Sequence, residues 1–312
     1  MGHKRQHWVP RSYLASWCDP DTPPGQEPYV WLFQKDGTNV KRRAPDNIFH
    51  ETDLYTIDVG GQRDLTLEHG LSTVESQFVR IRNEVLRRRQ PLNDEDRVWL
   101  LIFVAAAVSR TRAMRDHMRE QWTGMLQKMD RLQEHIDRAT PKQLERMIAA
   151  APPVSDNKDS SISHEAVKAM AETPLQIALP GMISSQLRIF RRMKLGILFH
   201  DFKPGFITSD TPCVWFDPES YKYPVLFRSP GLGMASIEVT LPISPRQMVI
   251  ISHQDNLEGY IPLYRSTVVD ELNRRTRFHC DEYLVVSRNE TRPVWFEERE
   301  PPDTSSAPST QH

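Results

Sequence analysis

Hydrophobic positions change their spacing along the chain, and near its start the spacing predicts short strands. Residues 29–33, YVWLF, form an apolar run that ends at the pair Asp36-Gly37, which is typical of a β-hairpin turn. Residues 39–43 are the expected partner strand, and residues 52–57 predict a third strand. The first part of the chain is therefore expected to contain a hairpin and one further strand.

From residue 65 onward the apolar residues recur at every third or fourth position, which is the spacing of a helix with one buried face. This first helix is expected to end near Gln90. A second helix begins after Asn93, where three acidic residues favour the positive end of the helix dipole, and a break is expected near Ser109 before residue 133. Further helices are predicted at residues 141–151, at 164–198 with an interruption at 179–181, and at 264–278.

The last third of the chain returns to alternating positions and short apolar runs, which are typical of strands. Five strands are predicted, at residues 205–208, 213–216, 237–241, 248–252 and 283–287. Strands thus cluster at both ends of the chain around a helical middle, and they do not alternate with helices. This pattern predicts an α+β protein in which the helical middle region packs on an antiparallel sheet built from N-terminal and C-terminal strands.

Composition and charge limit the class of protein. The 312 residues include 40 basic and 41 acidic side chains, and this balance argues against coating by nucleic acid while leaving room for a local basic patch. No window approaches the roughly 18 apolar residues of a membrane span, so no membrane association is expected. Cys18, Cys213 and Cys280 contain no CxxC pair, which predicts neither a disulfide framework nor a zinc ribbon and favours a cytoplasmic location.

Standard nucleotide and hydrolase signatures are absent from the sequence. There is no GxxxxGKS or GxxxxGKT phosphate loop, no GxGxxG after a predicted strand, no HExxH and no GxSxG. These absences remove support for nucleoside triphosphatases, Rossmann dehydrogenases, zincins and common esterases.

Seven short segments, taken in order, resemble the bacterial family called domain of unknown function 4238 (DUF4238). They are QHWVPRSYLASW, NIFHETDLY, LEHGLSTVE, SRTRAMR, GFITSDTP, LPISP, and ELNRRTR before YLVVS. The resemblance implies a single domain over residues 3–296 and no particular reaction. We expect a helical insertion at about 118–165 within this domain, and the proline- and serine-rich residues 297–312 are expected to be a disordered tail.

The opening segment supplies the first candidates for a site. His7 follows Gln6 and precedes Trp8-Val9-Pro10, so its imidazole is expected to be half-buried, and it can be a ligand, a general base or a structural hydrogen-bond partner. Gln6 and His7 are expected to point at a polar centre. The side chains expected to anchor the segment in apolar pockets are Trp8, Val9, Tyr13, Leu14 and Trp17.

Acidic and basic residues on the first two helices supply the next candidates. Glu68 and Glu75 lie seven residues apart and share one side of a helix, where they can hold a divalent cation or pair with an arginine. Arg110 and Arg112 follow the apolar run of the second helix and can bind such a carboxylate or a substrate phosphate. Arg112 and His117 also match the R-x4-H spacing of HEPN-type ribonucleases, although about three chance matches are expected in a chain of this composition.

Asp210 follows a buried strand and enters the turn Ser209-Asp210-Thr211-Pro212, where a rigid sheet can fix a reactive side chain. Turn aspartates also cap their own backbone, and both interpretations stay open. Asn273, on the helix before the last strand, can complete a polar cluster or dock that helix.

We therefore predict a catalytic centre of His7, Glu75, Arg110 and Asp210. The substrate-binding candidates are Gln6, Arg112 and Asn273, and Glu75 and Asp210 are the candidate ligands of Mg²⁺ or Mn²⁺. A base, two carboxylates and an arginine suit nuclease-like hydrolysis of a phosphodiester or nucleotide by acid–base or metal-assisted chemistry, with nucleic acid or a nucleotide as the partner. The alternative is a non-catalytic sensor or protein-interaction module, in which the same residues form a structural ionic lock.

Overall fold

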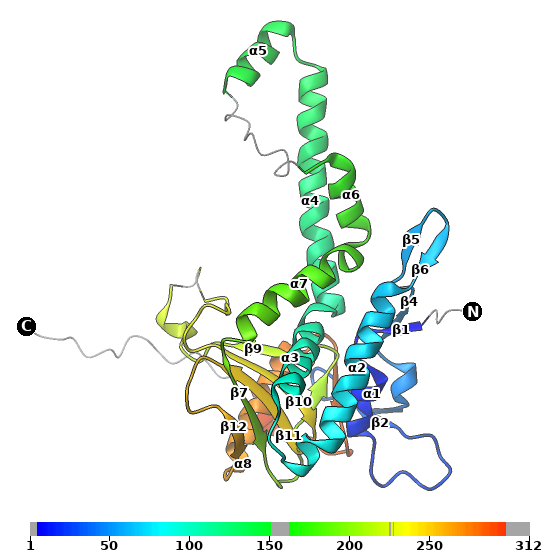
Figure 1. Cartoon of the computed structure of the whole chain (residues 1–312), viewed down its shortest axis with the longest axis vertical. Coiled ribbons are helices and arrows are strands. Elements are labelled where there is room, and N and C mark those ends of the chain that lie inside the picture. Colours follow the sequence, from blue (N-terminus) through cyan, green and yellow to red (C-terminus); the bar gives the residue numbers. More distant parts are fainter. Residues whose placement is uncertain (1–4, 151–161, 225, 227, 298–312) are drawn as a thin grey trace, which may run out of the picture. The chain divides into compact units, whose positions relative to one another are not determined.

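The computed structural model describes residues 5–150, 162–224, 226 and 228–297 of the chain, which form two compact units (Figure 1). The first unit is Met1–Thr111 with Gly181–His312, and the second is Arg112–Pro180. Helices and antiparallel strands are both present, which confirms the predicted α+β class. The tail predicted to be disordered lies outside the described residues from position 298 onward.

Short strands open the first unit. They are β1 (Arg5–His7), β2 (Val30–Gln34), β3 (Lys41–Arg43), β4 (His50–Thr52), β5 (Ile57–Val59) and β6 (Gln62–Asp64). β2 and β3 form the predicted antiparallel hairpin, with Gly37 in the left-handed conformation (φ 84°) in its turn. The single strand predicted at 52–57 is wrong, because Asp53 has φ 57° and turns the chain between β4 and β5.

Three helices of the first unit, α2 (Thr66–Glu84), α3 (Asp94–Ser109) and α8 (Ser266–His279), begin and end close to the predicted positions. Helix α1 (Arg11–Leu14) was not predicted. The short 3-10 helices are η1 (Ala15–Trp17), η2 (Pro45–Asn47), η3 (Leu86–Arg88), η5 (Ser220–Lys222) and η7 (Pro293–Trp295). Asn93 caps α3, since its side chain accepts a 2.7 Å hydrogen bond from the backbone N–H of Asp96. α2 and α3 then pack against each other.

One sheet joins strands from the two ends of the chain, as predicted. Its order is β3-β2-β13-β8, where β13 is Tyr283–Val286 and β8 is Thr208–Ser209. β13 pairs antiparallel with both β2 and β8. Chain segments about 250 residues apart in sequence are therefore neighbours in this sheet. Local patterns in the sequence do not determine which of these distant strands pair with each other.

A second sheet consists only of strands from residue 194 onward. Its order is β12-β7-β11-β10-β9, with β7 (Lys194–Phe199), β9 (Val214–Phe216), β10 (Glu238–Ser244), β11 (Gln247–Ser252) and β12 (Gly259–Pro262). β12 pairs parallel with β7, so the prediction of one antiparallel sheet is incomplete. The helix predicted up to residue 198 is also wrong there, because the short apolar run of β7 has no periodicity that distinguishes a buried strand from a buried helix.

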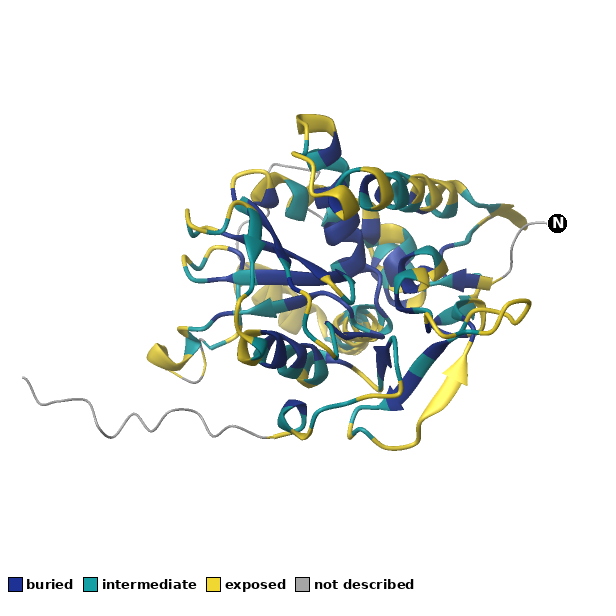
Figure 2. Cartoon of the chain, turned by 90° about the horizontal axis from the view of Figure 1, so that it is seen from below, coloured by how far each residue is buried: buried dark blue, intermediate teal, exposed yellow. Residues whose placement is uncertain are grey.

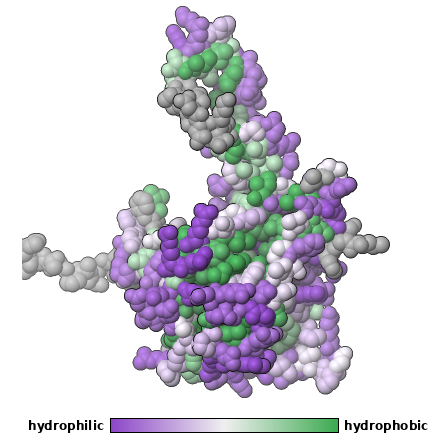
Figure 3. All heavy atoms as spheres, viewed as in Figure 1, coloured by the Kyte–Doolittle hydropathy of each residue, from purple (hydrophilic) through white to green (hydrophobic). Residues whose placement is uncertain are grey.

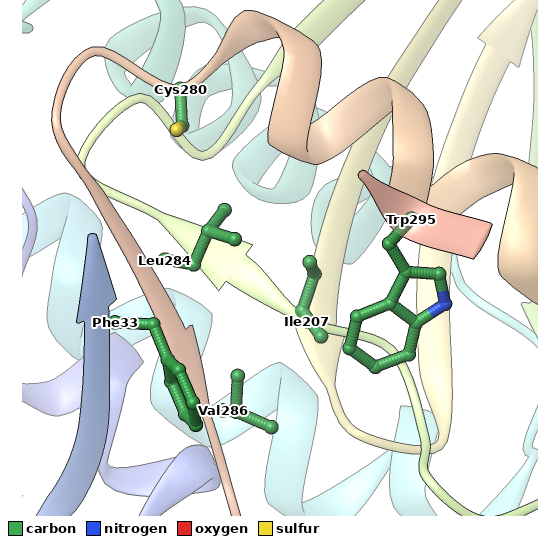
Figure 4. Close-up of a cluster of buried hydrophobic side chains, with 6 residues drawn as sticks. All are labelled: Phe33, Ile207, Cys280, Leu284, Val286 and Trp295. Carbon is green, nitrogen blue, oxygen red and sulfur yellow. The ribbon is translucent and has the colours of Figure 1, made fainter. Parts of the chain in front are cut away.

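Two hydrophobic clusters hold α8 and the sheets together. One contains Phe33, Ile207, Cys280, Leu284, Val286 and Trp295, and Figure 4 shows these side chains between the strands and the 3-10 helix η7. The other joins α8 to β7 and β11 through Leu198, Phe206, Met248, Ile250, Val269 and Leu272. Figure 2 shows the buried residues concentrated in the strands and on one side of the helices, and the exposed residues concentrated at turns and outer edges.

The second unit is helical. It contains α4 (Arg112–Asp137), α5 (Pro141–Ala150), α6 (His164–Glu172) and the start of α7 (Pro174–Phe190). α4 packs against α6, where the imidazole of His164 lies 2.6 Å from the carboxylate of Asp130. The predicted break near Ser109 is confirmed. The interruption predicted at 179–181 is wrong, because α7 continues through Pro180 and the helices are separated at Thr173.

Across the parts of the chain that the structure describes, no helix has the length and apolar character needed to cross a membrane. Hydrophilic residues cover much of the face shown in Figure 3.

Candidate functional site

The opening segment is anchored as predicted. Trp8, Val9, Tyr13, Leu14 and Trp17 are all buried. Gln6, expected to bind substrate, is fully buried in β1, where its side chain donates to the hydroxyl of Thr56 (3.0 Å) and accepts from the backbone N–H of Tyr55 (2.5 Å). Its amide therefore binds the loop that follows β4, and its burial leaves no surface for a substrate.

A pocket of about 720 Å³ lies between α2 and the start of the chain. α2 contributes Glu68, Ser72, Glu75, Ser76 and Val79, and the segments around β1, α1 and η2 contribute Arg5, His7, Arg11, Ser12 and Asp46. The prediction that Glu68 and Glu75 share one side of a helix is confirmed, since both line this pocket. We call it the His7 pocket.

His7 is half-buried in this pocket, as expected. Its Nε2 lies 3.3 Å from the carbonyl oxygen of Asp46. A carbonyl oxygen only accepts, so Nε2 donates and Nδ1 of the neutral ring keeps its lone pair. Burial lowers the pKa of His7 below its ordinary value of 6.5, and His50, whose ring centroid is 5.3 Å away, lowers it further, while the Asp46 carbonyl acts in the opposite direction. The ring is therefore neutral at pH 7.

Glu75 is fixed by an arginine from the next helix. Nη1 of Arg110 donates a 2.8 Å hydrogen bond to Oε1 of Glu75. The Arg110 side chain is 1% exposed and that of Glu75 is 24% exposed, so the carboxylate reaches the pocket while the guanidinium lies behind it. Within the described residues, Nε and Nη2 of Arg110 have no hydrogen-bond acceptor. The predicted pairing of these two residues is confirmed, and among the described residues it uses only the Nη1 donor of the guanidinium.

Asp210, predicted to be both a catalytic residue and a metal ligand, lies in a different environment. Its carboxylate accepts three backbone N–H groups, from Asp281 (2.9 Å), Glu282 (2.7 Å) and Tyr283 (2.9 Å). Burial raises the pKa of Asp210, and these three hydrogen bonds act in the opposite direction. Asp210 does not line the His7 pocket. The structure therefore separates it from His7 and Glu75 and uses it to hold the turn before β13. The interpretation that Asp210 caps its own backbone is also wrong, because the N–H groups that it binds belong to a segment about 70 residues further along the chain.

Asn273 also has a docking role. Its side chain accepts from the backbone N–H of Ile207 (3.0 Å) and donates to the carbonyl of Gly205 (3.0 Å). The residue is fully buried. Both ends of the amide are occupied by backbone groups, so Asn273 fastens α8 to the segment before β8 and does not contact the His7 pocket.

Arg112 begins α4 and belongs to the second unit, as does His117. Five residues along a helix correspond to a rotation of about 140°, so these two side chains leave α4 on different sides. The R-x4-H spacing therefore does not place them on one face of the helix.

The predicted pair of metal ligands is not formed. Among the residues that the structure describes, no group of three or more His, Cys, Asp or Glu side chains is arranged to hold a metal ion. Glu75 is bound to Arg110 and Asp210 to three backbone amides, in separate places. These two carboxylates therefore provide no common site for Mg²⁺ or Mn²⁺.

Several pocket residues were missed from the sequence. Ser72 and Ser76 follow Glu68 at four-residue intervals, and this spacing alone places all three on one face of α2. Arg11 forms a 3.1 Å ion pair with Asp46 across the pocket edge. No local pattern links these two residues, because they come from separate segments that only the fold brings together.

Comparison with known proteins gives a family match. The family described as "Protein of unknown function (DUF4238)" matches residues 5–290. No curated protein and no solved structure matches the chain.

Proposed function

The chain belongs to the DUF4238 family, and we propose that it is a hydrolase of phosphodiester or nucleotide substrates whose active site is the His7 pocket. The observation that carries the proposal is the shared pocket of His7 and Glu75, with Arg110 bound behind the carboxylate. The pocket volume of about 720 Å³ is within the range of about 300–1,000 Å³ that is typical of small-molecule sites.

His7 is the proposed general base. A neutral imidazole with an unprotonated Nδ1 can take a proton from water, whose oxygen then forms a bond to phosphorus while the ester P–O bond breaks. The proton held by His7 returns through water to the oxygen that leaves. No charged species accumulates over the cycle, and no oxidant or reductant is consumed.

Glu75 is the proposed carboxylate that orients the attacking water, and Arg110 is a positioning residue that fixes Glu75. Arg5 and Arg11 are the residues proposed to bind the substrate phosphate, because both line the same pocket and each can bind phosphate oxygens. Two arginines near the developing negative charge stabilise the transition state, because Coulomb attraction grows as charge builds on the phosphoryl oxygens. We also propose a cytoplasmic location, in keeping with three cysteines that form no disulfide.

The test is hydrolysis of RNA, DNA and nucleotides by the purified full chain, with Mg²⁺ or Mn²⁺ and separately with a chelator. His7→Ala is expected to lower kcat/KM by about 100-fold or more. His69→Ala is the matched control, since His69 is exposed on α2 outside the pocket and its loss is expected to leave the rate unchanged. Turnover that persists with the chelator supports acid–base chemistry. No turnover of these substrates, or equal rates for the two variants, contradicts the proposal.

A second candidate function is a non-catalytic sensor or interaction module. The observation that favours it is the closed Glu75–Arg110 pair, which can be an ionic lock between α2 and α3. Turnover distinguishes the two, because the Glu75–Arg110 pair is expected to stabilise the chain in either case. If the natural chain is active, a stable but inactive His7→Ala variant supports the enzyme. A natural chain that turns over none of the tested substrates supports the module.

A further inference from the structure

A second pocket of about 590 Å³ shares no lining residue with the His7 pocket. It lies where the end of α2 and η3 meet the segments after β7, between β10 and β11, and after β13. Its basic lining residues are Arg82, Arg87, Arg89, Lys203, Arg246 and Arg288, and its acidic ones are Asp201 and Glu290. We call it the arginine pocket. Arg288 forms an ion pair with Asp21, which is outside the lining, and the other five cations against two carboxylates give the lining a positive charge.

Most of these cations have no carboxylate to neutralise them. Within the described parts of the chain, no carboxylate oxygen lies within 4.0 Å of a charged nitrogen of Arg82, Arg87, Arg89 or Lys203. Arg246 has only Asp201 at 3.9 Å, and that side chain is 90% exposed. Burial lowers the pKa of Arg82, Tyr13 acts in the opposite direction, and the positive charge of Arg87 lowers the pKa further. Like charges so close together favour a bound anion.

Hydrogen bonds hold the pocket in shape. Nη1 of Arg82 donates to the carbonyl of Ser12 (2.9 Å), which fixes the guanidinium. Nη1 of Arg246 donates to the carbonyl of Phe202 (3.2 Å). Nε2 of Gln247 donates to the carbonyl of Leu86 (2.7 Å) and so ties β11 to the segment that carries Arg87 and Arg89. Preorganised donors bind an anion at a lower entropic cost than flexible surface cations.

Arg89 has a backbone conformation that glycine would adopt more easily. Its φ is 53°, in the left-handed region, where an ordinary side chain is uncommon. Its guanidinium lies 4.0 Å from the centroid of the Phe199 ring, which also lines the pocket. An arginine at a strained backbone position, with its guanidinium held over an aromatic ring, indicates that its positive charge has a function such as anion binding.

We propose that the arginine pocket binds the di- or triphosphate group of a nucleotide-sized small molecule. Arginine guanidinium groups bind phosphate oxygens through paired hydrogen bonds, and Phe199 and Phe202 provide apolar surface beside them. The two carboxylates in the lining and the limited volume of about 590 Å³ fit a compact anion better than a continuous nucleic-acid backbone. The site is independent of the activity proposed for the His7 pocket.

The test is equilibrium binding of inorganic tripolyphosphate and of ATP to the full chain by titration calorimetry at about 0.15 M salt, where long-range surface attraction is screened. Both anions are expected to bind and to compete, and adenosine alone is expected to bind far more weakly. Arg89→Gly and Arg87→Gln are each expected to weaken tripolyphosphate binding by about tenfold or more. Because glycine suits the backbone at position 89, this variant is expected to fold.

Arg88→Gln is the matched control. It removes the same charge from an exposed neighbour that does not line the pocket, so binding is expected to change by less than about twofold. The double variant Arg5→Gln with Arg11→Gln removes the two cations proposed to bind phosphate in the His7 pocket. It is expected to bind tripolyphosphate as the natural chain does, which separates the arginine pocket from the proposed active site. The proposal is overturned if neither anion binds below about 1 mM, if Arg88→Gln weakens binding as much as Arg87→Gln, or if only single-stranded oligonucleotides bind.

Discussion

Arg110 reaches from the C-terminal end of α3 to the α2 carboxylate of Glu75, and the 2.8 Å hydrogen bond between them joins residues 35 positions apart. The guanidinium is 1% exposed, so nearly all of its charge is removed from water. Such a cation is tolerated in a protein interior only when a counter-charge and hydrogen bonds replace the lost water. This pair therefore fixes the distance between the two helices and the position of a pocket carboxylate at the same time.

Removing the carboxylate is expected to destabilise the chain. Glu75→Ala leaves the buried Arg110 guanidinium without its counter-charge and is expected to lower the free energy of unfolding by about 3 kcal/mol, at the low end for buried pairs because Glu75 is partly exposed. The double variant Glu75→Ala with Arg110→Met is expected to recover most of this loss. Urea unfolding measures both values, and a double variant as unstable as the single one would show that the pair is not coupled.

An exposed ion pair provides the control for this experiment. Arg138 and Glu134 lie 3.5 Å apart on the surface, with side chains 80% and 62% exposed. Glu134→Ala is expected to change the free energy of unfolding by less than about 0.5 kcal/mol, because water screens the pair. A loss comparable to that of Glu75→Ala would mean that burial is not the cause of the larger effect.

Asp210 is expected to matter for stability and not for turnover. In Asp210→Asn, an amide NH₂ replaces one of the two oxygens that face the backbone N–H groups of residues 281–283, so at least one of these donors loses its acceptor. The expected loss is about 1–3 kcal/mol. The rate per folded molecule is expected to stay at the natural value, as measured by activity normalised to the folded fraction. A stable but inactive Asp210→Asn protein would return this residue to the active site.

His200 is expected to make stability depend on pH. Its side chain is buried, and its Nδ1 accepts a 3.0 Å hydrogen bond from the backbone N–H of Phe202, so protonation of this nitrogen breaks the bond. Burial, with a further contribution from the charge of Arg246, lowers the pKa of His200 to about 4. The unfolded chain binds this proton near pH 6.5, and the folded chain binds it only near pH 4. The contribution of His200 to the free energy of unfolding is therefore complete above pH 6.5 and is lost as the pH decreases towards 4.

The measurement is the free energy of unfolding at pH 7 and at pH 4.5. The natural chain is expected to lose about 2–3 kcal/mol more over this interval than His200→Asn, whose amide oxygen can still accept from the backbone N–H. His69→Asn, which changes an exposed histidine, is expected to lose as much as the natural chain. Identical losses in all three proteins would show that His200 does not govern the acid sensitivity.

Gly205 and Gly124 are expected to respond to alanine in opposite directions. A Cβ at Gly205 would overlap the carbonyl oxygen of Pro245, so Gly205→Ala is expected to cost about 3 kcal/mol through a forced backbone shift. At Gly124, inside α4, no described atom lies within 4 Å of the new Cβ, apart from its chain neighbours and its own helix backbone. Gly124→Ala is expected to stabilise the helix by about 0.5–1 kcal/mol. Thermal unfolding checks both signs, and a stabilised Gly205→Ala protein would contradict the close packing of this loop.

Local patterns account for the parts of the fold that were predicted well. The α2 and α3 helices, the Asn93 cap and the hairpin at Gly37 depend on residues within a few positions of one another, and their chemistry is readable from the sequence. The failures also have a local cause. The apolar run of β7 lacks a distinguishing period, and Asp53 adopts a left-handed turn that its residue type permits but does not require.

The sequence by itself determined the α+β class, the family, the buried anchoring of the opening segment and the shared face of Glu68 and Glu75 on α2. Only the tertiary structure decided that His7 joins this face, that Asp210 is bound by backbone N–H groups just before and at the start of β13, and that cations from four separate segments line one pocket. The physical reason is that side-chain periodicity is a property of neighbouring residues, whereas a site forms when loop closure and burial bring distant segments together.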